Sequence, residues 1–91
     1  MRILVVEDER KIARLIQKGL KELGFAVDLI GRGDEALEII LYNPFEAIVL
    51  DIMLPGRDGL SILRALRERS NAVPVLILTA RGAGYRIGDS T

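Results

Sequence analysis

The sequence predicts an α/β fold with a doubly wound parallel sheet, because two hydrophobic periods alternate along it. Four short runs are mostly aliphatic and typical of strands, at residues 3–6, 25–30, 47–50 and 73–78. In the stretches between them, apolar residues recur every three or four positions, as in amphipathic helices. Strands that alternate with helices favour parallel pairing through right-handed crossovers. We therefore predict the order β-α-β-α-β-α-β.

The predicted strands differ in the continuity of their hydrophobic runs. The first, third and fourth (ILVV, AIVL and VPVLIL) are uninterrupted, as expected for parallel strands that are covered on both faces. The second (FAVDLI) contains Asp28, so we expect it at an edge of the sheet.

The predicted helices have recognisable ends. The first covers residues 10–23 and is followed by Gly24, a residue suited to end a helix. Its apolar face consists of Ile12, Leu15, Ile16, Leu20 and Leu23. The second helix runs from a cap at Asp34 to about Tyr42. The third begins at Asp58 or Ser61, with Leu60, Leu63 and Leu66 turned inward.

Composition limits the protein to one small domain and excludes several kinds of site. The 91 residues are 49% apolar, which is enough for a core but not for two domains. With 13 basic and 13 acidic residues, no net charge attracts nucleic acid or an anionic membrane. Cysteine and histidine are absent, which excludes disulfides, thiolate metal sites and imidazole chemistry. No apolar run is long enough for a signal peptide or a membrane span, so we expect a cytoplasmic protein.

Acidic residues follow two of the predicted strands. Glu7 and Asp8 come directly after the first strand, and Asp51 comes directly after the third. If these strands are neighbours, the three carboxylates converge at the carboxyl edge of the sheet, where ligands of such folds bind. Thr79, after the fourth strand, would border the same crevice. Taken singly, each residue has a simpler explanation: EDER as an acidic helix start, Asp51 as a turn residue and Thr79 as a strand-end hydroxyl.

A divalent cation would relieve the repulsion among three clustered carboxylates. Mg²⁺ prefers oxygen ligands and keeps several waters, which leaves room for a phosphoryl group beside it. A carboxylate next to such a cation can attack phosphorus and form an acyl phosphate.

Three segments occur together in the right order at the strand ends: ILVVEDE (residues 3–9), AIVLDIMLPGRDG (47–59) and PVLILTA (74–80). Together they resemble the receiver domain of two-component response regulators, most closely that of the OmpR/PhoB subfamily of transcription factors. The resemblance covers residues 1–81 and implies a flavodoxin-like fold. It implies a phosphoacceptor in a phosphorelay, served by a sensor histidine kinase that docks on the face of the first helix, rather than an enzyme.

The resemblance also implies a role for individual residues. Asp51 is similar to the phosphoacceptor, and Thr79 to the switch hydroxyl that moves onto the phosphoryl group. The implied ligands of Mg²⁺ are Glu7, Asp8, Asp51 and the backbone carbonyl of Met53. Pro55 and Gly59 match the loop that shapes the floor of the pocket.

The chain departs from the family pattern after Ala80. The family continues with a fourth helix, a fifth strand that ends in lysine–proline, and a fifth helix, whereas the last lysine here is Lys21. We therefore expect a receiver domain truncated after the fourth strand, with impaired phosphorylation.

The segment RGAGYRI (residues 81–87) resembles the final ribbon of the winged-helix output domain of OmpR/PhoB regulators. We therefore expect a truncated receiver domain at residues 1–81 and a short tail at 82–91, joined by an internal deletion. An ordinary truncation with an unrelated tail is the alternative. In either case we expect no binding of DNA by this chain and no membrane contact.

Two classes of function follow from these observations. In the first, the protein is a phosphoacceptor that takes a phosphoryl group on Asp51 with Mg²⁺. In the second, it is a non-signalling remnant that self-associates. The fourth strand would then be an apolar edge with unpaired backbone groups. The tail would pair with it, either in the same chain or, as we expect, by exchange between chains. The predicted dimer or higher oligomer has residues 73–78 and Gly84–Ile87 at its interface.

Overall fold

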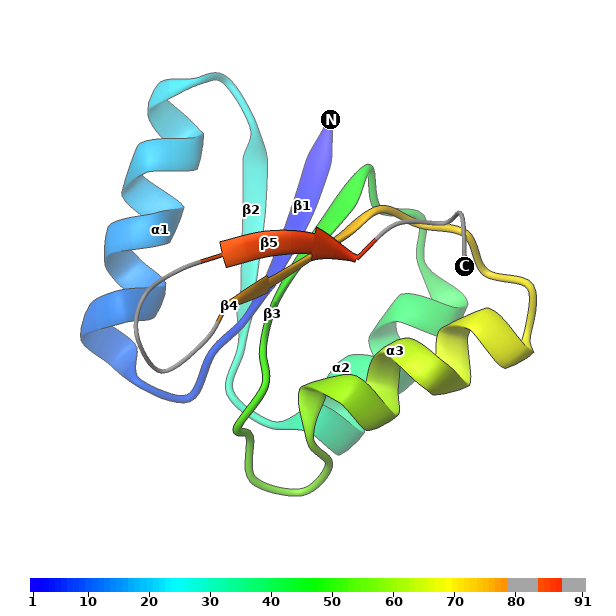
Figure 1. Ribbon diagram of the computed structural model, residues 1–91. Coiled ribbons are helices and arrows are strands. Elements are labelled where there is room, and N and C mark those ends of the chain that lie inside the picture. The colour runs from blue at the N-terminus through cyan, green and yellow to red at the C-terminus, as the bar shows by residue number, and fades with distance from the viewer. Residues whose placement is uncertain (79–83, 88–91) are drawn as a thin grey trace.

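The computed structural model describes residues 1–78 and 84–87, which form one sheet with helices on both faces (Figure 1). The strands are β1 (Arg2–Val6), β2 (Ala26–Ile30), β3 (Ala47–Asp51), β4 (Val75–Leu78) and β5 (Gly84–Ile87). The helices are α1 (Arg10–Glu22), α2 (Gly33–Tyr42) and α3 (Gly59–Glu68). None of the helices in these described residues is long and apolar enough to cross a membrane.

The sheet has the order β2-β1-β3-β4-β5. β1 pairs in parallel with β2 and β3, and β3 pairs in parallel with β4. The predicted parallel four-stranded sheet with three helices is therefore confirmed, as is the edge position of β2. Glu7 and Asp8 follow the carboxyl end of β1, and Asp51 is the last residue of β3. These two strand ends lie side by side.

The tail adds a fifth strand that the predicted order lacked. β5 runs antiparallel to β4, with Gly84 opposite Leu78 and Ile87 opposite Val75. The expected pairing of the tail with β4 is therefore present, but it forms within one chain rather than by the exchange between chains that we expected. Only residues 79–83 separate the two strands in sequence, and a parallel return would need a crossover of a dozen or more residues.

The core has two layers, one on each face of the sheet. α1 packs on one face over a cluster formed by Ile3, Val5, Val27 and Val49. α2 and α3 cover the other face (Figure 1), where the larger cluster includes Leu4, Val6, Ile48, Leu50 and Ile77. Successive residues of β1 thus point to opposite layers, and all four from Ile3 to Val6 are buried. Both faces of the strand are covered, which explains its continuous apolar sequence.

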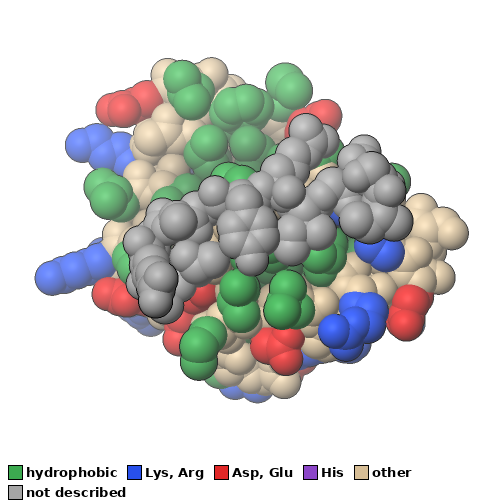
Figure 2. Space-filling model, in the orientation of Figure 1, with side chains coloured by type: hydrophobic (Ala, Val, Ile, Leu, Met, Phe, Trp, Pro, Cys, Tyr) green, Lys and Arg blue, Asp and Glu red, His purple; other side chains and the backbone are tan. Residues whose placement is uncertain are grey.

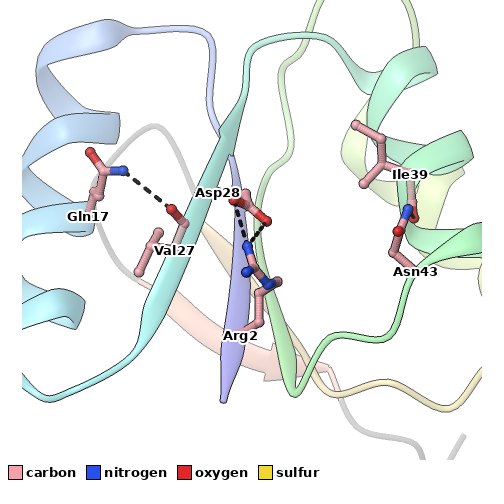
Figure 3. A network of polar contacts seen from close by, with 6 residues as sticks. All are labelled: Arg2, Gln17, Val27, Asp28, Ile39 and Asn43. Carbon is pink, nitrogen blue, oxygen red and sulfur yellow. Dashed lines mark hydrogen bonds and ion pairs between the residues drawn. The ribbon is translucent and has the colours of Figure 1, made fainter.

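Polar contacts hold the edge strand β2 in place (Figure 3). Arg2 donates to both carboxylate oxygens of Asp28 at 2.9 and 2.8 Å, so the charge in the predicted edge strand is paired. Gln17 of α1 donates to the backbone oxygen of Val27 at 3.4 Å. These contacts tie β2 to β1 on one side and to α1 on the other.

The end of α1 follows the prediction, whereas part of its apolar face does not. Gly24 has a φ of +97°, and the N–H of Phe25 donates to the oxygen of Leu20 at 3.1 Å, which closes the helix as expected. Leu15 and Leu23 were predicted to face inward, but they are 72% and 75% exposed. The physical reason is that α1 packs mainly on β1 and β2, so only a narrow stripe of the helix reaches the sheet.

The starts of the other two helices were predicted with unequal success. Asp58 caps α3, because its carboxylate accepts from the N–H of Ser61 at 2.8 Å. Asp34 does not cap α2; the helix starts two residues earlier than predicted, after the cap residue Arg32, and Asp34 forms an ion pair with Arg32 at 3.1 Å. The prediction that Leu60 faces inward is also wrong, since this residue is 40% exposed. At the other end of α2, Asn43 donates to the oxygen of Ile39 at 2.9 Å (Figure 3).

Candidate metal centre

Three carboxylates meet at the carboxyl edge of the sheet. The pairing of Val6 in β1 with Leu50 in β3 places the residues that follow them, Glu7 and Asp51, side by side. Carboxylate oxygens of Glu7, Asp8 and Asp51 all lie within 4.8 Å of one another. The convergence expected from neighbouring strands is therefore present in the structure.

Glu7 is the buried member of this cluster. Its backbone N–H donates to the oxygen of Ile30 at 3.0 Å, and its carboxylate accepts from the N–H of Glu9 at 3.5 Å. Burial raises the pKa of Glu7 from its ordinary 4.5 to about 7, and the hydrogen bond with Asp51 and repulsion by its charge add to this effect. The N–H of Glu9 acts in the opposite direction. Without a cation, Glu7 therefore holds a proton in a large share of molecules at neutral pH.

Asp51 ends β3 and is followed by a loop, residues 52–58, that folds back toward it. The N–H of Met53 donates to the Asp51 carboxylate at 3.3 Å, and the N–H of Gly59 donates to the oxygen of Ile52 at 2.8 Å. A Cβ atom on Gly59 would overlap the backbone oxygen of Asp51, so this position requires glycine. The loop consequently lies against the half-buried Asp51, while the side chain of Met53 is exposed.

The cluster is open to solvent on two sides. Glu7 and Asp8 line a depression of about 270 Å³ that also includes Ile30 and Gly31. Asp8 also lines a second depression, of about 690 Å³, formed largely by the loop after Asp51. A small charged ligand can therefore reach Asp8 from either depression and Glu7 from the smaller one.

The donor set fits a hard divalent cation. It consists of carboxylate oxygens without nitrogen or sulfur, which is the ligand chemistry that Mg²⁺ prefers. Burial, followed by the hydrogen bond and charge of Asp51, raises the pKa of Glu7, so the ionised form of Glu7 is costly without a cation. A bound Mg²⁺ would balance the charge and leave positions for water or a phosphoryl group.

Some of the predicted residues receive no structural assignment. Thr79 and Arg81 lie outside the described residues. Met53 follows Asp51 in the site loop, and the use of its carbonyl as a ligand stays a prediction. The division of the chain at residue 81 is likewise a prediction.

One contact of the site loop was not predicted from the sequence. The N–H of Gly33 donates to the oxygen of Pro55 at 3.0 Å. No sequence pattern points to this contact, because the start of α2 and the loop that contains Pro55 are far apart in the sequence and meet only in the folded protein.

The chain matches a known protein family and several curated relatives over most of its length. The family model described as "Response regulator receiver domain" matches residues 3–87. The transcriptional regulatory protein DltR of Streptococcus agalactiae is 48% identical over 85 residues, and QseB of Escherichia coli O157:H7 is 45% identical over 94. These matches cover 93% and 97% of the chain but only 38% and 43% of the relatives. The chain thus spans about two fifths of the length of these curated relatives.

Solved structures show the same fold. A receiver domain of a Francisella response regulator has a TM-score of 0.84 at 38% identity, covering 90% of this chain and 68% of that one. TrrA of Thermotoga maritima, solved with Mg²⁺ and beryllium fluoride, has a TM-score of 0.81 at 35% identity, covering 87% and 69%. The receiver domain of a sensor histidine kinase of Pseudomonas aeruginosa has a TM-score of 0.82 at 36% identity, covering 87% and 66%. That domain was solved with a magnesium ion in its active-site cleft.

Proposed function

Since the chain belongs to the response regulator receiver domain family, we propose that it accepts a phosphoryl group on Asp51, with Mg²⁺ as cofactor. The observation that carries the proposal is the convergence of Glu7, Asp8 and Asp51 at the carboxyl ends of β1 and β3. The Thermotoga relative binds Mg²⁺ with beryllium fluoride and the Pseudomonas relative binds magnesium in its cleft, which supports a similar chemistry here.

The proposed reaction is a phosphoryl transfer to a carboxylate. One carboxylate oxygen of Asp51 forms a bond to phosphorus, and the bond from phosphorus to the donor breaks. The donor leaves as a histidine imidazole from a kinase, or as acetate if acetyl phosphate is used. The ligands proposed for Mg²⁺ are Glu7, Asp8, Asp51 and the carbonyl of Met53. Bound to these ligands, Mg²⁺ would supply positive charge to the phosphoryl oxygens. Thr79 is proposed as the switch hydroxyl.

The proposed partner is a sensor histidine kinase that docks on the exposed face of α1. That face carries the basic residues Arg10, Arg14, Lys18 and Lys21. We propose a cytoplasmic location, where such a kinase domain would deliver its phosphoryl group. Because the chain covers less than half of the transcriptional regulators that it resembles, we propose no DNA binding for these 91 residues.

Beryllofluoride, a mimic of the phosphoryl group, tests this function directly. We expect the 91-residue protein to bind beryllofluoride only in the presence of millimolar Mg²⁺, observed as a ¹⁹F resonance of the bound ion and as a higher melting temperature. Asp51→Asn should abolish the resonance because the attachment atom is lost. Asp8→Ala should abolish both the resonance and the stabilisation by Mg²⁺ alone.

Glu46→Gln is a matched control, since it also neutralises an exposed acid but lies at the other end of β3. It should leave both signals unchanged. A melting temperature that does not respond to Mg²⁺ in the parent protein, or responds equally in Asp8→Ala, would show that the carboxylates do not form a metal site.

A second candidate function, self-association, is favoured by the apolar surface on the α1 side of the molecule. Leu15, Leu23 and Leu76 are 72%, 75% and 40% exposed. On the face shown in Figure 2, several hydrophobic side chains lie at the surface. Within the described residues, no strand pairs with the outer edge of β5. An edge and an apolar surface together favour association with a second copy, so we propose residues 73–78 and Gly84–Ile87 as its interface.

Light scattering checks this second candidate. At micromolar concentration we expect a mass of at least twice the 10.1 kDa of the chain. Leu76→Asp should shift the protein toward the monomer, because a charge cannot be buried at an apolar contact. Leu60→Asp is the control: Leu60 is equally exposed, at 40%, but lies on α3, across the sheet from α1. A stable monomer of 10.1 kDa would exclude self-association.

A further inference from the structure

The loop that follows Asp51 is held by the start of α2. Gly33, the first residue of α2, is buried and its N–H donates to the backbone oxygen of Pro55 at 3.0 Å. The two segments come from different crossovers, one between β2 and α2 and the other between β3 and α3. Residues 52–58 are therefore fixed from outside the loop as well as by their own contacts.

No side chain fits at the Gly33 position. A Cβ atom there would overlap the backbone oxygen of Arg57 and would lie 2.7 Å from its carbonyl carbon. The obstacle is main chain, which cannot rotate away as a flexible side chain can. Any larger residue at position 33 must push the loop away from α2 or shift the start of the helix.

The contact is reciprocal, because a second glycine meets α2 from the loop side. Gly56 has a φ of +83°, and a Cβ atom on it would overlap the Asp34 carboxylate and lie 2.8 Å from Nη2 of Arg32. These two side chains form an ion pair at 3.1 Å in the first turn of α2. Each segment thus presents a glycine to the other, so the loop and the start of α2 lie close together.

The same loop holds the groups that complete the metal centre. It begins directly after Asp51, and the N–H of Met53 donates to the Asp51 carboxylate at 3.3 Å. Its far end returns to the site, where the N–H of Gly59 donates to Ile52. Because the loop is short and held at both ends, a displacement of the backbone at Arg57 is expected to move Met53 as well.

We propose that Gly33 is a positioning residue of the metal centre, which acts through the site loop and sets the position of Met53 relative to Asp51. The inference rests on the proposed function, since it assumes that Mg²⁺ binds at Asp51. It assigns the first turn of α2 a role in the site although no residue of that turn belongs to the carboxylate cluster.

Gly33→Ala and Gly19→Ala form a matched pair that tests the proposal. Both glycines lie in a helix, but a Cβ atom on Gly19 of α1 meets nothing within 4 Å. We expect Gly33→Ala to raise the dissociation constant of Mg²⁺, measured by calorimetry, by about 10–100-fold, the usual effect of losing support for a metal ligand. Gly19→Ala should change it less than about 2-fold.

A second readout uses the metal-free protein. In Gly33→Ala the NMR resonances of the Met53 and Gly59 amides should shift, and the Met53 amide should exchange faster with solvent. If Gly33 had only a structural role, the substitution would lower the melting temperature without these local changes. Arg32→Ala/Asp34→Ala removes the two exposed side chains that Gly56 faces, so it should fold and show the same shifts at smaller amplitude. If Gly33→Ala does not fold, this double variant decides the question.

Unchanged Met53 and Gly59 amides in the variants would overturn the positioning role. If instead the parent protein shows no Mg²⁺ binding at all, the proposed function fails. The amide shifts would then still report whether α2 positions the loop, so the two failures are distinguishable.

Discussion

In the absence of divalent cations, replacing Glu7 with glutamine should stabilise the protein by about 3 kcal/mol at pH 8, and by little near pH 4. Glu7 is buried beside Asp51, and its pKa is raised from 4.5 to about 7. Glutamine has the shape of the protonated carboxyl group and never becomes charged. For a domain of this size the expected gain in melting temperature is on the order of 10 °C.

The sign follows from proton uptake. Between pH 4.5 and 7 the folded protein keeps a proton on Glu7 that the unfolded chain releases, so the free energy of unfolding falls as pH rises through this window. Stability is full below the unfolded pKa of 4.5 and lost progressively up to the folded pKa. Urea melts with EDTA at several pH values measure it: the parent should lose stability from pH 4.5 to 7, and Glu7→Gln should lose much less.

Glu38→Gln serves as the control, because Glu38 is an exposed acid on α2 that lies outside the carboxylate cluster. It should retain the pH dependence of the parent. Equal pH dependence in Glu7→Gln and the parent would contradict the assigned cause. Glu7→Gln should also bind Mg²⁺ poorly, because a neutral amide replaces a carboxylate ligand. The substitution should therefore stabilise the fold and weaken the metal site.

In the 91-residue polypeptide, acetyl phosphate should label Asp51 about 10²–10³-fold more slowly than it labels the receiver domain of the Francisella response regulator. All three lysines of the sequence lie in α1, at positions 11, 18 and 21. The family resemblance implies a lysine from a fifth strand that balances charge on the phosphoryl oxygens. Loss of one such contact costs about 3–4 kcal/mol in the transition state.

Chemical rescue distinguishes a missing cation from a poorly formed site. Methylammonium ions should accelerate labelling of the parent, because they supply the lost charge from solution, but should not label Asp51→Asn. Phosphate incorporation followed by intact-mass spectrometry measures both. Rapid, stoichiometric labelling without methylammonium would show that the lysine is not required in this chain.

The fold and the carboxylate cluster were largely predictable from the sequence. The continuous apolar run of β1 and the interrupted run of β2 reflect how many faces of each strand are covered, and burial imposes such patterns residue by residue. Glu7, Asp8 and Asp51 were identified because strand ends of a parallel sheet meet at one edge, a rule that depends on topology rather than on detailed contacts. The end of α1 followed from Gly24 and the start of α3 from Asp58. Both residues act through hydrogen bonds and backbone angles within the helix end itself, so neither depends on contacts that are distant in sequence.

What only the tertiary structure decided depends on contacts between segments that are far apart in sequence. Leu15 belongs to the apolar pattern of α1 but is exposed, because the position of the helix over β1 and β2 determines which part of that pattern is buried. The tail pairs with β4 of its own chain, whereas exchange between chains was expected from the sequence. The contact of Gly33 with the loop after Asp51 has no sequence signal, since glycine in a turn looks the same whether it faces solvent or another main chain. Local patterns therefore determined the elements and the acidic edge, and packing determined which surfaces are covered and how the site loop is held.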